Sequence, residues 1–191
     1  TGFRYFKSLS GQGEAPTPVP VRIANSTTLR IGDLVRVNTS GLLVTAAVGE
    51  ACASPLLGFV DEKGINPFSL GYNRAGVTLT GDDTLATSAT NSSRADYIRG
   101  EIVIDPAGDI LWLNDADSDL AQTRLFQYFD ANANGRQVTV STGSDANGVL
   151  QLIQWDPEQD PATADASKGV FRIAENQFGL SLDSATAKNA A

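Results

Sequence analysis

The chain has 191 residues and 41% hydrophobic content, which fits one globular domain or two small ones that share an interface. It contains no His and a single Cys, so Ser-His-Asp triads, His-ligated metal sites and internal disulfides are excluded. The net charge of −8, with 14 scattered Lys and Arg residues, argues against nucleic acid as a partner. No apolar run is long enough to span a membrane, so we expect no membrane partner.

Residues 1–20 carry several aromatic side chains but lack the pattern of a segment that folds on itself. Three prolines at alternate positions favour an extended backbone. Two interpretations fit: a strand of the chain's own core with a loose connector, or an extended arm that docks on a neighbouring chain. In the second interpretation the residues that bind the partner are Phe3, Arg4, Tyr5, Phe6 and Lys7.

Residues 21–114 are predicted to form a β-domain. Short strand-like runs recur at intervals of about 10 to 15 residues, the spacing of a β-sandwich or barrel. The runs are Val21–Ala24, Leu34–Val37, Leu42–Thr45, Leu56–Val60, Val77–Thr80, Glu101–Ile104 and Asp109–Leu113. Between the last two, Asp105-Pro-Ala-Gly108 predicts a hairpin loop.

Residues 115–180 are expected to contain one helix and a second β-rich portion. Asp119 is a candidate N-cap, and a helix from Asp119 to Phe129 would pack against the open side of the β-domain. Its apolar face consists of Ala121, Leu125, Tyr128 and Phe129. The strands expected after it are Gln137–Val140, Val149–Trp155 and Gly169–Ile173. Residues 181–191, which have no large side chain, are expected to be a flexible tail.

The predicted fold class is therefore mainly β. It comprises a small sandwich-like or barrel-like domain with one short helix, an extended N-terminal arm and a second β-rich portion near the C-terminus. We find no catalytic constellation or phosphate-binding loop, and we expect a protein that is not an enzyme and needs no cofactor.

One motif resembles a metal site. Asp130, Asn132 and Asn134, followed by Gly135, match the opening of a calcium loop. The candidate is weak because two of the three ligands are neutral and Ser141 stands where a calcium loop has a bidentate Glu. The alternative is a helix-stop loop built from Asn and Gly.

A second acidic cluster lies at Asp115, Asp117 and Asp119. Three carboxylates at alternate positions have the chemistry of a cation site. The same residues are equally expected as solvated charges at the N-terminus of the predicted helix, where the helix dipole favours anions.

A longer stretch carries a pattern of strands and turns that resembles a known family. It runs from Val21 through Ile31-Gly-Asp-Leu-Val35 and a Gly-tipped turn at Gly41 to Ala46-Ala-Val-Gly-Glu50 and Leu57-Gly-Phe-Val60. Over about residues 21–62 the chain resembles the head decoration, or cement, proteins of tailed bacteriophages. The resemblance implies a small β-tulip-like domain on the outer capsid surface of the virion. It also implies a non-enzymatic role: a homotrimer that clamps adjacent subunits of the major capsid protein.

A second hypothesis is a β-rich carbohydrate-binding or adhesive module. Calcium held by Asp130, Asn132 and Asn134 would assist it. Exposed aromatic rings would then serve as platforms for sugar rings, and the candidates are Tyr72, Tyr97 and Trp112.

Overall fold

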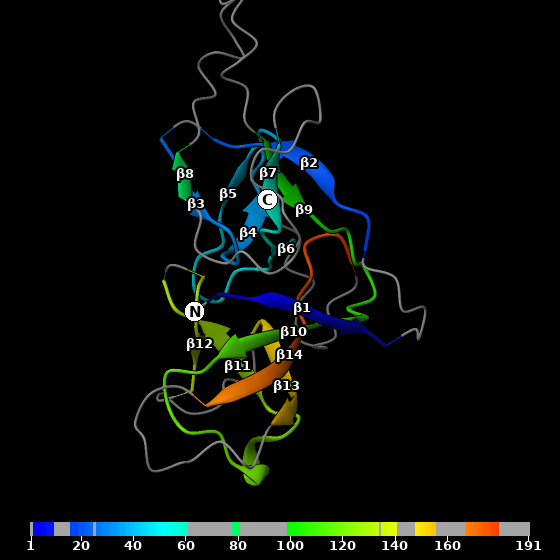
Figure 1. The fold of residues 1–191 in the computed structure, drawn as a ribbon, viewed down its shortest axis with the longest axis vertical. Coiled ribbons are helices and arrows are strands. Elements are labelled where there is room, and N and C mark those ends of the chain that lie inside the picture. Colours follow the sequence, from blue (N-terminus) through cyan, green and yellow to red (C-terminus); the bar gives the residue numbers. More distant parts are fainter. Residues whose placement is uncertain are drawn as a thin grey trace, which may run out of the picture.

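The computed structural model describes residues 2–9, 16–24, 26–60, 78–80, 99–133, 135–140, 148–155 and 167–179. Antiparallel strands dominate these residues, so the prediction of a mainly β fold is confirmed. The strands are arranged in an upper and a lower half (Figure 1). The upper half holds the strands β2 to β9, and the lower half is built on one six-stranded sheet.

The upper half contains three small antiparallel sheets with the orders β2-β9-β7, β5-β4-β6 and β3-β8. Six of these strands overlap predicted runs, with β2 and β9 displaced by two residues, whereas β3 and β6 were not predicted. The bounds are β2 Val19–Arg22, β3 Thr28–Arg30, β4 Leu34–Val37, β5 Leu43–Thr45, β6 Ser54–Pro55, β7 Gly58–Val60, β8 Thr78–Thr80 and β9 Arg99–Ile102.

The lower half is a single antiparallel sheet with the order β1-β10-β14-β13-β11-β12. The bounds are β1 Arg4–Ser8, β10 Ile110–Asp115, β11 Tyr128–Ala131, β12 Val138–Thr139, β13 Leu150–Trp155 and β14 Lys168–Ile173. The first strand of the chain pairs with β10, and β10 pairs with β14, so strands far apart in sequence are neighbours (Figure 1). This sheet therefore crosses the segment boundaries predicted at residues 20 and 114.

The expectation of an extended N-terminal arm is wrong for the beginning of the chain. Residues 4–8 form β1, an integral strand of the lower sheet. Phe3 is 3% exposed and belongs to the main hydrophobic core, against which Tyr5 also packs. The other interpretation is correct: this segment is a strand of the chain's own core. Phe3 and Tyr5 point to the core and Arg4 between them does not, which is the alternation of a half-buried strand.

The α-helix expected from Asp119 to Phe129 is also absent from the structure. One turn of 3-10 helix occupies Gln122–Arg124, and β11 begins at Tyr128. The Phe126 N–H donates to the carbonyl oxygen of Leu152 at 2.8 Å, which joins this segment to β13. Tertiary pairing with β13 therefore overrides the helical spacing of the apolar residues.

The predicted hairpin at Asp105–Gly108 is a connection between two sheets instead. β9 pairs with β2 and β7, whereas β10 pairs with β1 and β14. The Asp105 carboxylate accepts hydrogen bonds from the N–H groups of Asp109 at 3.0 Å and Ile110 at 2.8 Å. The turn was correctly located from sequence, but it carries the chain from the upper half into the lower half.

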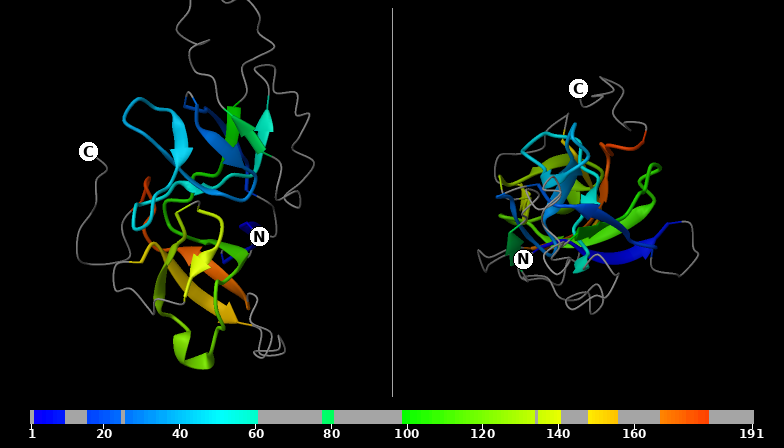
Figure 2. Two further views of the ribbon diagram at one scale, coloured as in Figure 1. Left: turned by 90° about the vertical axis from the view of Figure 1, so that its left-hand side faces the viewer. Right: turned by 90° about the horizontal axis from the view of Figure 1, so that it is seen from above.

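Two hydrophobic cores share a middle layer of the chain. The lower core includes Trp112, Phe129 and Phe171, and the upper core includes Leu29 and Phe59. At four places adjacent residues face opposite cores. These pairs are Leu34 and Val35, Cys52 and Ala53, Leu57 and Leu56, and Val103 and Ile102, with the lower-core residue named first. The two halves are thus packed on a common layer, as the side view of Figure 2 illustrates.

A partly buried ion pair also joins the halves. Arg136 Nε lies 2.8 Å from Asp33 Oδ1, and Asp33 is 2% exposed. Beside the pair, the Leu34 N–H donates to the Gly135 carbonyl oxygen at 2.8 Å. Gly135 has φ +63°, and a Cβ there would lie 2.8 Å from the Leu34 carbonyl oxygen. Glycine is therefore required at this contact, both for the backbone conformation and for the close approach.

Candidate interaction surface

The pleat of the lower sheet divides its residues between two faces. Tyr5 lies opposite Trp112, which lies opposite Phe171, which lies opposite Leu152, so these four share one face. This is the core face: the last three are fully buried. The Tyr5 and Trp112 rings meet edge to face, with centroids 6.3 Å apart and planes at 82°, a favourable arrangement for aromatic pairs.

The opposite face of the same four strands is basic. Its cross-strand rows are Arg4, Leu113, Val170 and Gln154; Lys7, Leu111, Arg172 and Gln151; and Asp115 with Lys168. We call this the basic face and define it by the cations Arg4, Lys7, Lys168 and Arg172. Leu111 and Val170 between them are buried, so the apolar side chain that the face offers to a partner is the partly exposed Leu113. Within β1, β10, β13 and β14 it carries four cations and one carboxylate, in a chain whose net charge is −8.

An aromatic residue extends the basic face at its β1 edge. The register shifts between Tyr5 and Lys7, and this irregularity leaves Phe6 without a partner position on β10. A shift of this kind re-aims a side chain locally. Phe6 is 41% exposed, and the Lys7 ammonium lies 5.4 Å from the centre of its ring. An exposed aromatic ring beside a cation is a common feature of protein interfaces.

Hydrogen bonds fix the β13 side of the basic face. Arg172 Nε donates to Gln151 Oε1 at 2.7 Å, and Gln151 Nε2 donates to the Phe126 carbonyl oxygen at 2.9 Å. This chain of contacts holds the Arg172 side chain along the sheet. The cation at this position is therefore preorganised, whereas Arg4 and Lys7 are exposed residues of an edge strand.

A hollow of about 180 Å³ lies at one end of the basic face, lined by Gly2, Arg4, Leu113, Asn114, Asp115 and Lys168. Asn114 is buried and supports it from below. Its Oδ1 accepts hydrogen bonds from the N–H groups of Gly2 at 3.3 Å and Asp115 at 2.8 Å, while its Nδ2 donates to the Arg136 carbonyl oxygen at 3.0 Å. The wall of the hollow is therefore rigid, and its rim carries two cations and one carboxylate.

The residues predicted to bind a partner divide between the two faces. Phe3 is a core residue and is not available as an anchor, so that part of the prediction is corrected, while Tyr5 is half-buried and packs against the same core. Arg4, Phe6 and Lys7 lie on the exposed side of β1. The sequence analysis missed Lys168 and Arg172. Lys168 lies one residue before the predicted strand, and Arg172 is the one charged residue within it, which was the available signal of an outward-facing position.

The calcium-like motif forms the turn between β11 and β12. Asp130 Oδ1 accepts a hydrogen bond from the Val149 N–H at 3.3 Å, and Asn132 Oδ1 accepts one from the Arg136 N–H at 3.0 Å. Asn134 lies outside the described residues. The Asn132 oxygen is an acceptor within the turn, as in the alternative of an Asn- and Gly-rich loop, whereas the Asp130 oxygen joins β11 to the residue before β13. The loop follows 3-10 and strand residues rather than a helix.

The second acidic cluster is spread over different environments. Asp115 lines the hollow, and Asp117 Oδ1 accepts a hydrogen bond from the Val140 N–H at 2.6 Å. Over the described parts of the chain, no group of three or more His, Cys, Asp or Glu residues is arranged to hold a metal ion.

The aromatic platforms of the carbohydrate hypothesis are only partly within the described structure. Trp112 is fully buried in the lower core, so it offers no ring to a sugar, and this assignment is corrected. Tyr72 and Tyr97 lie outside the described residues.

The single cysteine, Cys52, is fully buried, and burial raises the pKa of its thiol to about 12. It therefore remains a protonated core residue.

Comparison of the chain with protein-family models, with curated proteins and with solved structures gives no match. Among the described residues, no helix is long and apolar enough to cross a membrane.

Proposed function

We propose that the chain is a non-enzymatic structural protein that binds the outer surface of a tailed-bacteriophage capsid. In this proposal it acts as a homotrimer on the virion and stabilises the capsid by clamping adjacent subunits of the major capsid protein. The proposal starts from the resemblance of residues 21–62 to head decoration proteins.

The observation that carries the proposal is that this segment builds a core of its own. Eight of the nine buried residues of the upper core come from it, and Ile102 is the ninth. The segment with the resemblance therefore supplies most of one hydrophobic core, although β9 completes its sheet. This supports a comparison with a small β-domain on the capsid surface.

The N-terminal arm has no part in the proposal, because Phe3 and Tyr5 are committed to the core. We assign attachment to the basic face instead. A face built on paired strands loses little conformational entropy on binding, which favours affinity for a given contact area. Phe6 and Arg4 belong to residue types that are enriched at protein interfaces, and Arg is also common among the residues that dominate binding energy.

The proposal is tested by co-sedimentation. The purified chain is mixed with expanded capsids assembled from the major capsid protein of the same genome, and the pellet is analysed after centrifugation. We expect saturable binding and a higher temperature of capsid disruption, because a ligand that binds the intact particle stabilises it. Capsids that neither bind the chain nor gain thermal stability would rule the proposal out.

Oligomeric state is measured separately by light scattering coupled to size exclusion. The proposal expects the mass of three chains, either free in solution or in material released from the capsids. A monomer in both preparations would remove the trimer from the proposal while leaving capsid binding to the sedimentation result.

A further inference from the structure

We infer that the hollow between β1, β10 and β14 receives a carboxylate side chain from an acidic segment of a partner protein. Its principal donor is the Arg4 guanidinium. The inference deepens the proposed function and rests on it for the partner, the major capsid protein. The ligand chemistry itself follows from the residues that line the hollow.

Arg4 has the position and the freedom that such a donor needs. It lies opposite Leu113 in the β1–β10 ladder, on the exposed side of β1, and lines the hollow. No hydrogen bond or ion pair joins its guanidinium to another side chain among the described residues. A guanidinium presents a planar pair of N–H donors that matches the two oxygens of a carboxylate.

The rest of the rim sets the charge that the hollow accepts. Lys168 contributes a second cation, and Asp115, its cross-strand neighbour, contributes one carboxylate. The residues that line the hollow thus include one more cation than anion, which favours an acidic group as the ligand. Leu113 adds an apolar contact for the methylene groups of an incoming Asp or Glu side chain.

Charge distribution favours an acidic protein segment over nucleic acid. The basic face is limited in extent, and the chain as a whole has a net charge of −8. A nucleic acid carries one phosphate charge about every 1.7 Å of duplex, so it would meet the acidic remainder of the protein. A protein surface with single carboxylates among apolar residues matches a face that combines Arg4 and Lys168 with Leu113 and the exposed ring of Phe6.

The test uses the full chain and defined probes. A fluorescein-labelled peptide of alternating Glu and Leu is titrated with the protein, and binding is followed by fluorescence anisotropy. The same peptide with Gln in place of Glu measures the contribution of charge, and a labelled single-stranded DNA represents the nucleic acid alternative. We expect binding of the Glu peptide alone, weakening as salt rises from about 50 to 200 mM.

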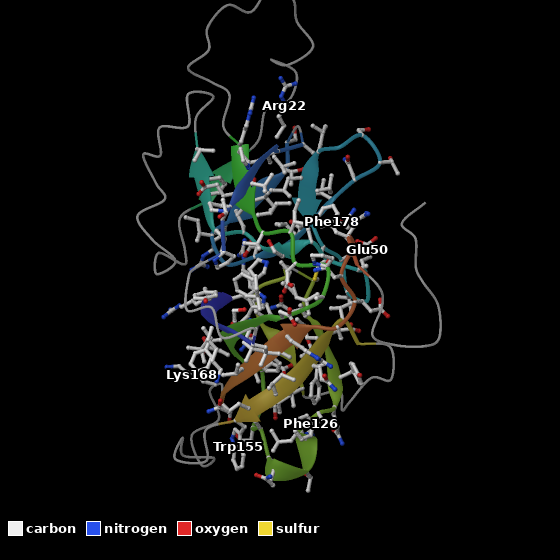
Figure 3. All side chains as sticks on the ribbon, turned by 90° about the vertical axis from the view of Figure 1, so that its right-hand side faces the viewer. Arg22, Glu50, Phe126, Trp155, Lys168 and Phe178 are labelled. Carbon is white, nitrogen blue, oxygen red and sulfur yellow. The ribbon has the colours of Figure 1, made fainter. Side chains whose placement is uncertain are left out.

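The variant Arg4→Gln removes the guanidinium and keeps a polar side chain of similar reach. We expect about a fivefold loss of affinity for the Glu peptide, the upper end of the range for an exposed ion pair. Arg22→Gln is the matched control, because Arg22 is an exposed residue of β2 in the upper half, far from Lys168 in Figure 3. It should change the affinity less than twofold. Lys168→Gln provides a second variant on the rim, and thermal melting verifies that each variant is folded.

The outcomes separate this inference from the proposed function. If the wild-type chain binds capsids and Arg4→Gln binds them equally well, the hollow is not the docking site, and the capsid proposal stands. If the Glu peptide binds through Arg4 but capsids do not bind, the carboxylate site stands, and the capsid proposal fails. Equal binding of the Glu and Gln peptides, tighter binding of DNA, or no peptide binding at all overturns the inference.

Discussion

At the scale of single residues, the Asp33–Arg136 pair combines a buried carboxylate with a close cation. Burial raises the pKa of the Asp33 carboxyl above its ordinary value of 3.8, and the hydrogen bond and charge of Arg136 oppose this effect only in part. The Arg30 N–H also donates to Asp33 Oδ2 at 2.9 Å. The pair thus fixes how the turn that ends at Asp33 meets the turn that contains Arg136. Keeping the buried Asp33 carboxylate charged costs free energy, because the carboxylate has lost its contact with water.

The raised pKa predicts a pH-dependent difference between the wild-type chain and Asp33→Asn. A carboxyl with a raised folded-state pKa contributes most to stability below its unfolded value, and this contribution is lost as pH rises through the folded value. The free energy of unfolding of the wild type, relative to Asp33→Asn, should therefore fall as pH rises above about 3.8 and then level off. Urea unfolding of both proteins across this range measures it. A relative gain for the wild type with rising pH would contradict the prediction.

At the scale of elements, β1 shows how an alternating strand assigns neighbouring residues to different roles. Phe3 precedes the strand and is buried in the lower core, whereas Phe6 is 41% exposed on the other side. The sequence showed aromatic and basic residues interleaved, which is the correct signal for a half-buried strand. It did not show which partner would cover the aromatic side, because that partner, β10, lies far along the chain.

This division predicts unequal effects of two identical substitutions. Phe3→Ala should lower the free energy of unfolding by about 3 kcal/mol, because it removes a buried aromatic side chain and leaves a cavity. Phe6→Ala should lower it by less than about 1 kcal/mol, since it loses only an exposed ring and a weak contact with Lys7. Urea titration followed by Trp fluorescence compares the two. Equal losses would show that the assignment of faces in β1 is wrong.

Most strands could be predicted because their apolar residues alternate within short runs bounded by turn residues. β4 coincides with the predicted run at Leu34–Val37, and β14 begins one residue before the predicted Gly169. The conformation of β11 could not be predicted, because Leu125, Tyr128 and Phe129 satisfy helical spacing equally well. The strand depends on hydrogen bonds to β13, which local sequence does not encode.

At the scale of the whole molecule, the cores are coupled by residues that they share along the chain. Adjacent positions such as Leu34 and Val35, or Cys52 and Ala53, point into different cores. Loss of one core would therefore expose apolar side chains in the layer that supports the other. The upper and lower halves, connected in this way, are therefore expected to unfold together.

Equilibrium unfolding tests this coupling directly. Trp112 and Trp155 both lie in the lower sheet, so their fluorescence reports on that half, while far-UV circular dichroism reports on the strands of both. We expect the two signals to change at the same urea concentration with one transition. A second transition seen by circular dichroism alone would show that the upper half unfolds independently.

The interaction surface was only partly predictable at this scale. Arg4 and Lys7 were recognised because they stand next to aromatic residues near the beginning of the chain. Their association with Lys168 and Arg172 depends on the β1-β10-β14 strand order, which brings together residues from distant parts of the sequence. No local pattern specifies that order, so the basic face emerges only from the topology.

The pairing of β1 with β10 also has a consequence for biosynthesis. Gly2 donates a hydrogen bond to Asn114, 112 positions further along the chain. As the polypeptide leaves the ribosome, Phe3 and Tyr5 therefore remain without their pairing strand until β10, Ile110–Asp115, has been translated. The residues of the upper core are complete at Ile102, so that half can fold first and offer the waiting segment a surface on which to assemble.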